Sequence, residues 1–328
     1  MIYGHTKMKN SIDKIGKDVI ELQIQALKKL KYSISKSFND AVKKIINCKS
    51  KVIICGVGKS GKIASKISAT LSSVGTPSFT ISPNECSHGD LGRITKQDIL
   101  ILISYSGNTI ELNDIINYAK LNKITLIGIV SNKNSNLYKS ADIKLFIPEV
   151  KEAGYKIVPT SSTTSQLALG DALSIATMIK KKFTKLDFKK FHPAGNLAKK
   201  LKTAGEIMLK GNKIPFVNEK ISIQKSLSTL NSKKLGFLVI LNDKKFITGV
   251  FTDGDLKRLM KKNKDIQNLK IKNFMTKKPY LVEENTLASD ILNLMNKKKI
   301  TNVCVYNKQN KKKIIGVIHI HSLIEILN

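Results

Sequence analysis

The chain has 328 residues, a length that predicts two or three domains, each with its own core. Its hydrophobic fraction of 41% is typical of a globular protein, and no apolar run approaches the roughly 20 residues that span a bilayer. Because the N-terminus also lacks the apolar core of a signal peptide, we expect a cytoplasmic protein with no membrane partner and no disulfide framework.

The net charge of +33 raises the question of nucleic-acid binding. Only Arg93 and Arg258 are arginines among the 57 basic residues, and the lysines are spread along the whole chain. Proteins that read phosphates and base edges favour arginine, because its planar guanidinium binds bidentately. We therefore predict no specific nucleic-acid partner, only non-specific binding of polyanions at low salt.

In chain order, the pattern predicts helices over residues 12–47 and then alternating strands and helices. The predicted strands and helices of this second part are strands 51–55, 77–81, 98–104, 125–131 and 143–147, and helices 63–74, 110–121 and 165–182. Continuous apolar strands separated by helices indicate an α/β fold, with a doubly wound, five-stranded parallel sheet covered on both faces.

A repeat with an offset of 67 residues begins after about residue 205. Gly249-Val250-Phe251 is matched by Gly316-Val317-Ile318, and Met208 is matched by Met275. A repeat that occurs twice predicts two small α+β modules that pack as a pair. The expected domains are residues 1–200, 206–263 and 270–328.

The first candidate site is the segment from Gly56 to Gly61, which follows a strand and opens a helix. Its sequence, Gly-Val-Gly-Lys-Ser-Gly, matches the dinucleotide fingerprint GxGxxG, whose glycines let the backbone approach a phosphate. The acidic residue expected about 20 positions later would be Glu85, which lies beyond the end of the next strand. The segment therefore indicates phosphate binding more than it indicates a nicotinamide site.

The second candidate site, Ser104-Tyr105-Ser106-Gly107-Asn108-Thr109, follows the third strand. Hydroxyls and helix N–H groups on such a turn suit a dianionic phosphate, although a serine-rich helix cap without a ligand gives the same pattern. Two such turns in one sheet favour a ligand, because ligands bind at the carboxyl ends of the strands of these sheets.

Five titratable residues are predicted near these turns: Lys59, His88, Glu111, Glu152 and His192. Sugar isomerisation needs such a set, with a base that moves a proton between C1 and C2, an acid for the carbonyl oxygen and a proton shuttle for ring opening. Cys86-x-His88-x-Asp90 offers too few ligands for a convincing metal site.

These segments together resemble a sugar isomerase (SIS) domain over residues 10–200, followed by a pair of cystathionine-β-synthase-type (CBS) modules. That order resembles the bacterial arabinose-5-phosphate isomerases. The matching segments are Gly56 to Gly61, His88-Gly89-Asp90-Leu91-Gly92, Ser104-x-Ser106-Gly107 with Glu111, Lys151-Glu152-Ala153, Pro159 to Thr164, Gly170-Asp171-Ala172-Leu173 and His192-Pro193-x-Gly195.

The resemblance implies an aldose–ketose isomerase, an intramolecular oxidoreductase that interconverts D-arabinose 5-phosphate and D-ribulose 5-phosphate. It implies a homotetramer without a cofactor or a required metal, in which zinc inhibits, near His88, and a product that feeds 3-deoxy-D-manno-octulosonate for lipopolysaccharide. The implied residues are Lys59, Glu111, Glu152 and His192 for catalysis, and Gly58, Ser60, His88, Ser104, Ser106 and Thr109 for substrate binding.

The chain departs from the family at a few positions. Asn84 and Ala194 replace glycines, Tyr105 replaces a small polar residue, and residues 154–157 differ from the usual stretch. In the first CBS module, Thr252 and Asp255 stand where such modules bind a nucleotide ribose. The second module has His319-Ile320-His321-Ser322 instead, so it lacks both ribose-binding residues. A purely structural or oligomerising role of the pair therefore stands beside nucleotide sensing.

Our hypothesis is proton transfer through a cis-enediol, with Glu152 favoured as the base and Glu111 as its alternative. Lys59 would stabilise the enediolate, and His192 would open the sugar ring, with His88 sharing that role or orienting a neighbour. Three alternatives remain at this point: another phosphosugar isomerase, a non-catalytic phosphosugar sensor and a nicotinamide-dependent oxidoreductase.

Overall fold

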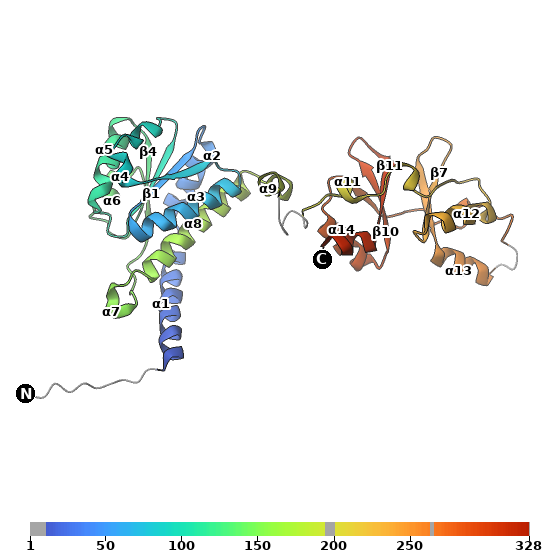
Figure 1. The fold of residues 1–328 in the computed structure, drawn as a ribbon, viewed down its shortest axis with the longest axis horizontal. Helices are drawn as coiled ribbons and strands as arrows, with labels where there is room; N and C mark the ends of the chain where they lie inside the picture. Colours follow the sequence, from blue (N-terminus) through green and yellow to red (C-terminus); the bar gives the residue numbers. More distant parts are fainter. Residues whose placement is uncertain (1–10, 194–200, 263–265, 328) are drawn as a thin grey trace, which may run out of the picture. The chain divides into compact units, whose positions relative to one another are not determined.

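The computed structural model describes residues 11–193, 201–262 and 266–327. The chain divides into two compact units, Met1–Phe191 and His192–Asn328, each of which is described by itself (Figure 1). Within the described ranges, no helix is both long enough and apolar enough to cross a membrane.

The first unit is built on an all-parallel sheet with the strand order β2-β1-β3-β4-β5. Its strands are β1 Val52–Gly56, β2 Ser78–Ile81, β3 Ile99–Ile103, β4 Thr125–Val130 and β5 Ile143–Phe146. The five predicted strands and the doubly wound α/β class are confirmed, because every predicted strand end lies within one residue of the observed one.

Helices cover both faces of this sheet (Figure 1). They are α1 Ile12–Ser33, α2 Lys36–Asn47, α3 Gly58–Ser73, α4 Pro83–Cys86, α5 Asn113–Leu121, α6 Asn136–Ser140, α7 Gly154–Ile157, α8 Ser161–Lys180 and α9 Lys185–Phe191, with 3₁₀ turns η1 Asp90–Arg93 and η2 Ile110–Leu112.

Successive residues of each strand serve opposite cores, since side chains alternate across a strand. Val52 and Ile54 of β1 pack with α1, α2, α3 and α8, whereas Ile53 and Cys55 pack with α4, α5 and α6. All four of these side chains are completely buried. This double burial explains why the central strands β1, β3 and β4 are continuous apolar runs and not alternating ones.

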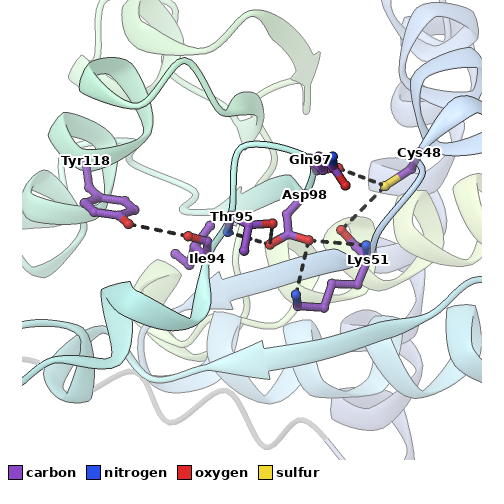
Figure 2. Close-up of polar contacts among 7 residues, drawn as sticks. All are labelled: Cys48, Lys51, Ile94, Thr95, Gln97, Asp98 and Tyr118. Atoms are coloured by element: carbon purple, nitrogen blue, oxygen red, sulfur yellow. Dashed lines mark hydrogen bonds and ion pairs between the residues drawn. The ribbon is translucent and has the colours of Figure 1, made fainter.

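At the amino-terminal end of the sheet, a buried carboxylate ties two strands together (Figure 2). Asp98, only 2% exposed, accepts hydrogen bonds from the backbone N–H of Thr95 at 2.7 Å and from the N–H of Lys51 at 3.3 Å. The Lys51 ammonium lies 3.3 Å from the same carboxylate. The entry of β1 is thereby fixed to the entry of β3.

The second unit contains two three-stranded sheets with equivalent topology, as the repeat predicts. In each sheet the middle strand is parallel to the first and antiparallel to the last. The strands are β6 Phe216–Asn218, β7 Phe237–Leu241 and β8 Ile247–Thr252, then β9 Leu281–Glu283, β10 Asn302–Asn307 and β11 Asn310–His319. The helices are α11 Ala204–Ile207, α12 Ile223–Lys233, α13 Asp253–Lys262, α14 Ala288–Lys298 and α15 Ile320–Leu327, with 3₁₀ turns η3 Gly211–Lys213 and η4 Ile271–Asn273.

The methionine segment of each repeat crosses to the other module. Leu209, next to Met208, pairs with Val317 of β11, and Thr276, next to Met275, pairs with Val250 of β8. A Cβ on Gly316 would overlap Met208, which explains the glycine of the Gly-Val pattern. The two modules therefore exchange their first segments and pack as one unit.

Candidate active site

The candidate site lies where the order of the sheet reverses direction. From β1 the chain runs to β2 on one side, and it then returns to β3 on the other side. The loops at the carboxyl ends of β1 and β3 therefore diverge and leave room for a ligand, as is general for open α/β sheets. Both phosphate-binding turns predicted from the sequence follow these two strands.

The first turn, Gly56 to Gly61, joins β1 tightly to α3. A Cβ on Gly61 would lie 2.7 Å from the carbonyl oxygen of Gly56, a distance that no side chain tolerates. The glycine pattern is therefore explained by close packing of the strand against the helix. Helix α3 starts at Gly58, five residues before its predicted start, so exposed Lys59 and half-buried Ser60 lie in its first turn.

The second turn is braced by its own hydroxyl groups. The buried Oγ of Ser104 accepts the N–H of Gly107 at 2.9 Å and lies 2.8 Å from Oγ1 of Thr109. Gly107 has a φ of +71°, and a Cβ there would overlap Ser135. The predicted helix over 110–121 is confirmed, with η2 as its first turn and α5 as its body.

Glu152 forms the cap of helix α8 from outside the helix. Its Oε2 accepts the N–H groups of Thr160 and Ser161, both at 2.8 Å, and its Oε1 accepts the N–H of Ser162 at 3.2 Å. Burial works to raise the pKa of this carboxyl, but the hydrogen bonds from the first turn of α8 outweigh burial and hold the pKa below its usual range. Glu152 is therefore a carboxylate at neutral pH.

A cavity of about 370 Å³ brings several of these residues together. Lys59 and Ser60 line it from the first turn, Tyr105 from the second, and Glu152 from the segment before α8. The remaining wall consists of Val57, Pro159, Ser162, Thr163 and Gln166. Two residues of opposite charge, Glu152 and Lys59, thus line one cavity at the carboxyl end of the sheet.

The other predicted site residues are not among those that line this cavity. Ser106 is exposed and Thr109 is half-buried on the second turn, and Glu111 is exposed in η2. His88 is exposed between α4 and η1, in the segment that follows β2. His192 is the first residue of the second unit, so its place in the site stays a prediction.

Within the described residues, no cluster of three or more His, Cys, Asp or Glu side chains could hold a metal ion. The four cysteines are free thiols, and burial raises the pKa of Cys55 to about 12 and that of Cys86 to about 11. The substitution at Ala194 and the ends of the first two expected domains, at 200 and 263, lie outside the described residues.

Gln166 also lines the cavity and was not predicted; it is only 1% exposed and accepts a hydrogen bond from the hydroxyl of Ser60 at 3.2 Å. A signal for it existed. Gln166 precedes Leu169 and Leu173 at helical spacing, so it is a polar residue on the buried face of α8.

The second unit has a cavity of about 710 Å³ lined by residues of both modules. From the first module, the hydroxyl of Thr252 donates to Asp255 at 2.8 Å, and Asp255 also pairs with Arg258. The second module contributes His319 and His321, whose ring centroids are 4.8 Å apart. Burial, together with His321, lowers the pKa of His319. The two halves of this cavity therefore differ chemically.

Comparison with known proteins covers both units. An SIS domain matches residues 44–176, and CBS domains match residues 204–262 and 271–328. The chain is 41% identical to the arabinose 5-phosphate isomerase KdsD of Yersinia pestis over 94% of each chain. It is 38% identical to KdsD of Escherichia coli K12 over 98% of each chain.

Two solved structures resemble the first unit. One is an E. coli CFT073 protein in complex with arabinose 5-phosphate, with 38% identity and a TM-score of 0.54, which covers 56% of this chain and 100% of that one. The other is a putative sugar-phosphate isomerase of Listeria monocytogenes, with 34% identity and a TM-score of 0.54, over 57% of this chain and 98% of that one. With an SIS domain, a CBS pair and relatives alike over nearly their full length, the chain belongs to the arabinose 5-phosphate isomerase family.

Proposed function

We propose that this chain interconverts D-arabinose 5-phosphate and D-ribulose 5-phosphate through a cis-enediol. The observation that carries this proposal is the cavity at the switch point of the sheet, where Glu152 and Lys59 face one space beside two phosphate-type turns. The near full-length similarity to KdsD enzymes supports this reaction over other phosphosugar isomerisations and over a non-catalytic sensor.

In this proposal, the turn after β3 anchors the phosphate. Ser104, Ser106 and Thr109 supply the hydroxyls, and the N–H groups of Gly107 and Asn108 hold the Oγ atoms of Ser104 and Ser106 in place. Gly58 and Ser60 approach the sugar from the start of α3. Binding energy from the phosphate then holds C1 and C2 against the residues of the cavity.

Glu152 acts as the base that removes the C2 proton of the aldose and returns it to C1. Over the same reaction, the hydroxyl proton moves from the oxygen on C2 to the oxygen on C1. Oε1 of Glu152 accepts the N–H of Ser162 at 3.2 Å and keeps a further lone pair for the substrate. Glu111 is the alternative base, and it would have to reach the sugar from its exposed position in η2.

Lys59 stabilises the negative charge that develops on the enediolate oxygen. Lys59 lines the same cavity as Glu152, so both charges act on one substrate. His192 opens the sugar ring as a proton shuttle, and His88 shares that role or orients a neighbour.

The test follows the reaction by proton NMR in D₂O, with the metal-free protein and D-ribulose 5-phosphate. Appearance of arabinose 5-phosphate with deuterium at C2 is the expected result. A folded protein that converts other phosphosugars but not this one would replace the substrate assignment. A protein that binds phosphosugars and converts none would favour the sensor.

The proposal extends to the rest of the chain. The cavity of the second unit, with Thr252 and Asp255 in it, binds a nucleotide. The chain forms a homotetramer, and the exposed isoleucines of α1 (Ile12, Ile15, Ile20 and Ile24) give apolar surface that subunits would cover. Its domains are 1–200, 206–263 and 270–328.

The protein works in the cytoplasm without a cofactor or required metal. Its product supplies the synthesis of 3-deoxy-D-manno-octulosonate for lipopolysaccharide. An inhibitory metal would bind near His88.

A further inference from the structure

Tyr105 lies between the two serines of the turn after β3, and its backbone is fixed there. The carbonyl oxygen of Tyr105 accepts the N–H of Ser131 at 3.0 Å, which ties the turn to the end of β4. The ring packs against the core shared by the sheet with α1, α2, α3 and α8. The side chain also lines the cavity that holds Glu152 and Lys59.

The hydroxyl of Tyr105 bridges this turn to the segment that carries Glu152. It accepts the backbone N–H of Val150 at 3.0 Å, across 45 positions of sequence. Val150 lies two residues before Glu152, in a stretch between β5 and α7 that has no helix or strand of its own. The position of Glu152 therefore depends on the individual contacts that this stretch makes with the rest of the unit.

On the other side of Glu152, the attachment is to α8. The N–H of Ala153 donates to the hydroxyl of Thr160 at 3.1 Å, and the carboxylate itself caps the helix. The segment around Glu152 is thus fixed at two points. Tyr105 holds Val150, which precedes Glu152, and the start of α8 holds Glu152 and Ala153. The contact with α8 fixes the carboxylate to the helix, and the contact with Tyr105 fixes its segment to the turn after β3.

We propose that Tyr105 is a positioning residue that sets the place of Glu152 relative to the phosphate-binding turn. The inference rests on the proposed function, in which that turn anchors the phosphate and Glu152 moves the proton. The distance between these two groups decides whether C2 of the bound sugar meets the base. A displacement of about 1 Å costs up to about a hundredfold in rate.

The test compares Tyr105→Phe with Tyr118→Phe. The second variant is a matched control, because Tyr118 is also half-buried against the sheet and loses one hydroxyl contact, to the carbonyl of Ile94 at 3.4 Å (Figure 2). For wild type and both variants, kcat, KM, inhibition by inorganic phosphate and the deuterium isotope effect with C2-deuterated arabinose 5-phosphate are measured. Amide hydrogen exchange reports on residues 148–153.

For Tyr105→Phe we expect kcat to fall about tenfold, with KM and phosphate inhibition changed by less than about threefold. The isotope effect on kcat should rise, because proton transfer becomes slower than the other steps, and exchange at residues 148–153 should speed up. Tyr118→Phe should keep the wild-type kcat and isotope effect. A role in folding alone would lower the melting temperature without changing the isotope effect.

Two outcomes would overturn the inference while leaving the function in place. One is an active wild type with an unchanged kcat and isotope effect in Tyr105→Phe. The other is a loss confined to KM and phosphate inhibition, which would make Tyr105 part of phosphate binding. A wild type that does not isomerise the sugar phosphate would remove the proposed function and this inference together.

Discussion

The two ends of the parallel sheet each hold a carboxylate that backbone N–H groups anchor, yet they use it differently. At the amino-terminal end, Asp98 is 2% exposed and is paired with Lys51 at 3.3 Å. At the carboxyl-terminal end, Glu152 caps α8 and is open to a cavity. Among the described residues, Lys59 forms no ion pair, although it lines the same cavity as Glu152.

Hydrogen bonds can stabilise a carboxylate in its ionised form without using all of its accepting positions. In both places, hydrogen bonds outweigh burial and lower the pKa of the carboxyl group. The contacts of Asp98 are complete, so its charge stabilises the fold and is closed to chemistry. Glu152 lines a cavity together with Lys59, and in the proposed function both charges act on the substrate there. The following predictions test this division, from the largest expected effect to the smallest.

Replacing Glu152 by Gln should give the largest effect. We expect turnover of arabinose 5-phosphate to fall about 10³-fold, because the amide cannot take the C2 proton. The amide oxygen can still accept N–H groups of α8, so the free energy of unfolding should fall by only about 1 kcal/mol. Steady-state kinetics and urea unfolding give both values. If Glu152→Gln stays active and Glu111→Gln does not, Glu111 is the base.

Replacing Asp98 by Ala should give the opposite result at the other end of the sheet. The change leaves the N–H groups of Thr95 and Lys51 without their acceptor and removes the partner of the Lys51 ammonium. We expect the free energy of unfolding to fall by about 3 kcal/mol, since buried donors and a charge lose their partner. The turnover per folded molecule should not change. A loss of turnover in fully folded protein would contradict the division between the two ends.

A pair of lysine variants tests the same division with smaller effects. Lys59→Met should lower kcat about 50-fold through lost stabilisation of the enediolate, while the unfolding free energy stays within about 0.5 kcal/mol. Lys51→Met should do the reverse, with unchanged kcat and a loss of about 1 kcal/mol of stability. Steady-state kinetics on both variants gives kcat, and melting followed by circular dichroism gives the change in stability. Unchanged turnover in Lys59→Met would remove this residue from the mechanism.

Much of the first unit is predictable from local pattern. The central strands β1, β3 and β4 could be found to within one residue because burial on both faces makes each of them an apolar run. The start of α8 could not be predicted in this way. The predicted start, residue 165, is four residues late, because the hydroxyl-rich segment before it has no apolar periodicity. Its cap is Glu152, eight residues before Thr160 in the sequence, so tertiary contact decides where the helix begins.

The site divides in the same way. Lys59 and Glu152 could be proposed from motifs, and the structure brings both to one cavity. The bridge from Tyr105 to Val150 depends on where a stretch without regular structure lies, which no local pattern specifies. Short α7 was also not predicted, because Tyr155 and Lys156 have φ values of 58° and 69°, which non-glycine residues seldom adopt.

The pH dependence should distinguish the two carboxylates most subtly. Because both folded-state pKa values are lowered, each group stabilises the fold above its unfolded-state pKa and loses this contribution as the pH falls through its folded-state pKa. Urea unfolding between pH 7 and pH 3 should therefore show a shallower acid loss in Asp98→Asn and in Glu152→Gln than in wild type. Only Glu152 should also control activity, so the acid limb of kcat/KM should lie below the usual range of a glutamate. The second ionisation of the substrate phosphate, at about pH 6, gives a separate limb that is present with any base. An added acid limb at the ordinary pKa of a glutamate would mean that Glu152 is not the base, and the hydrogen bonds at α8 would then serve the fold alone, as those of Asp98 do.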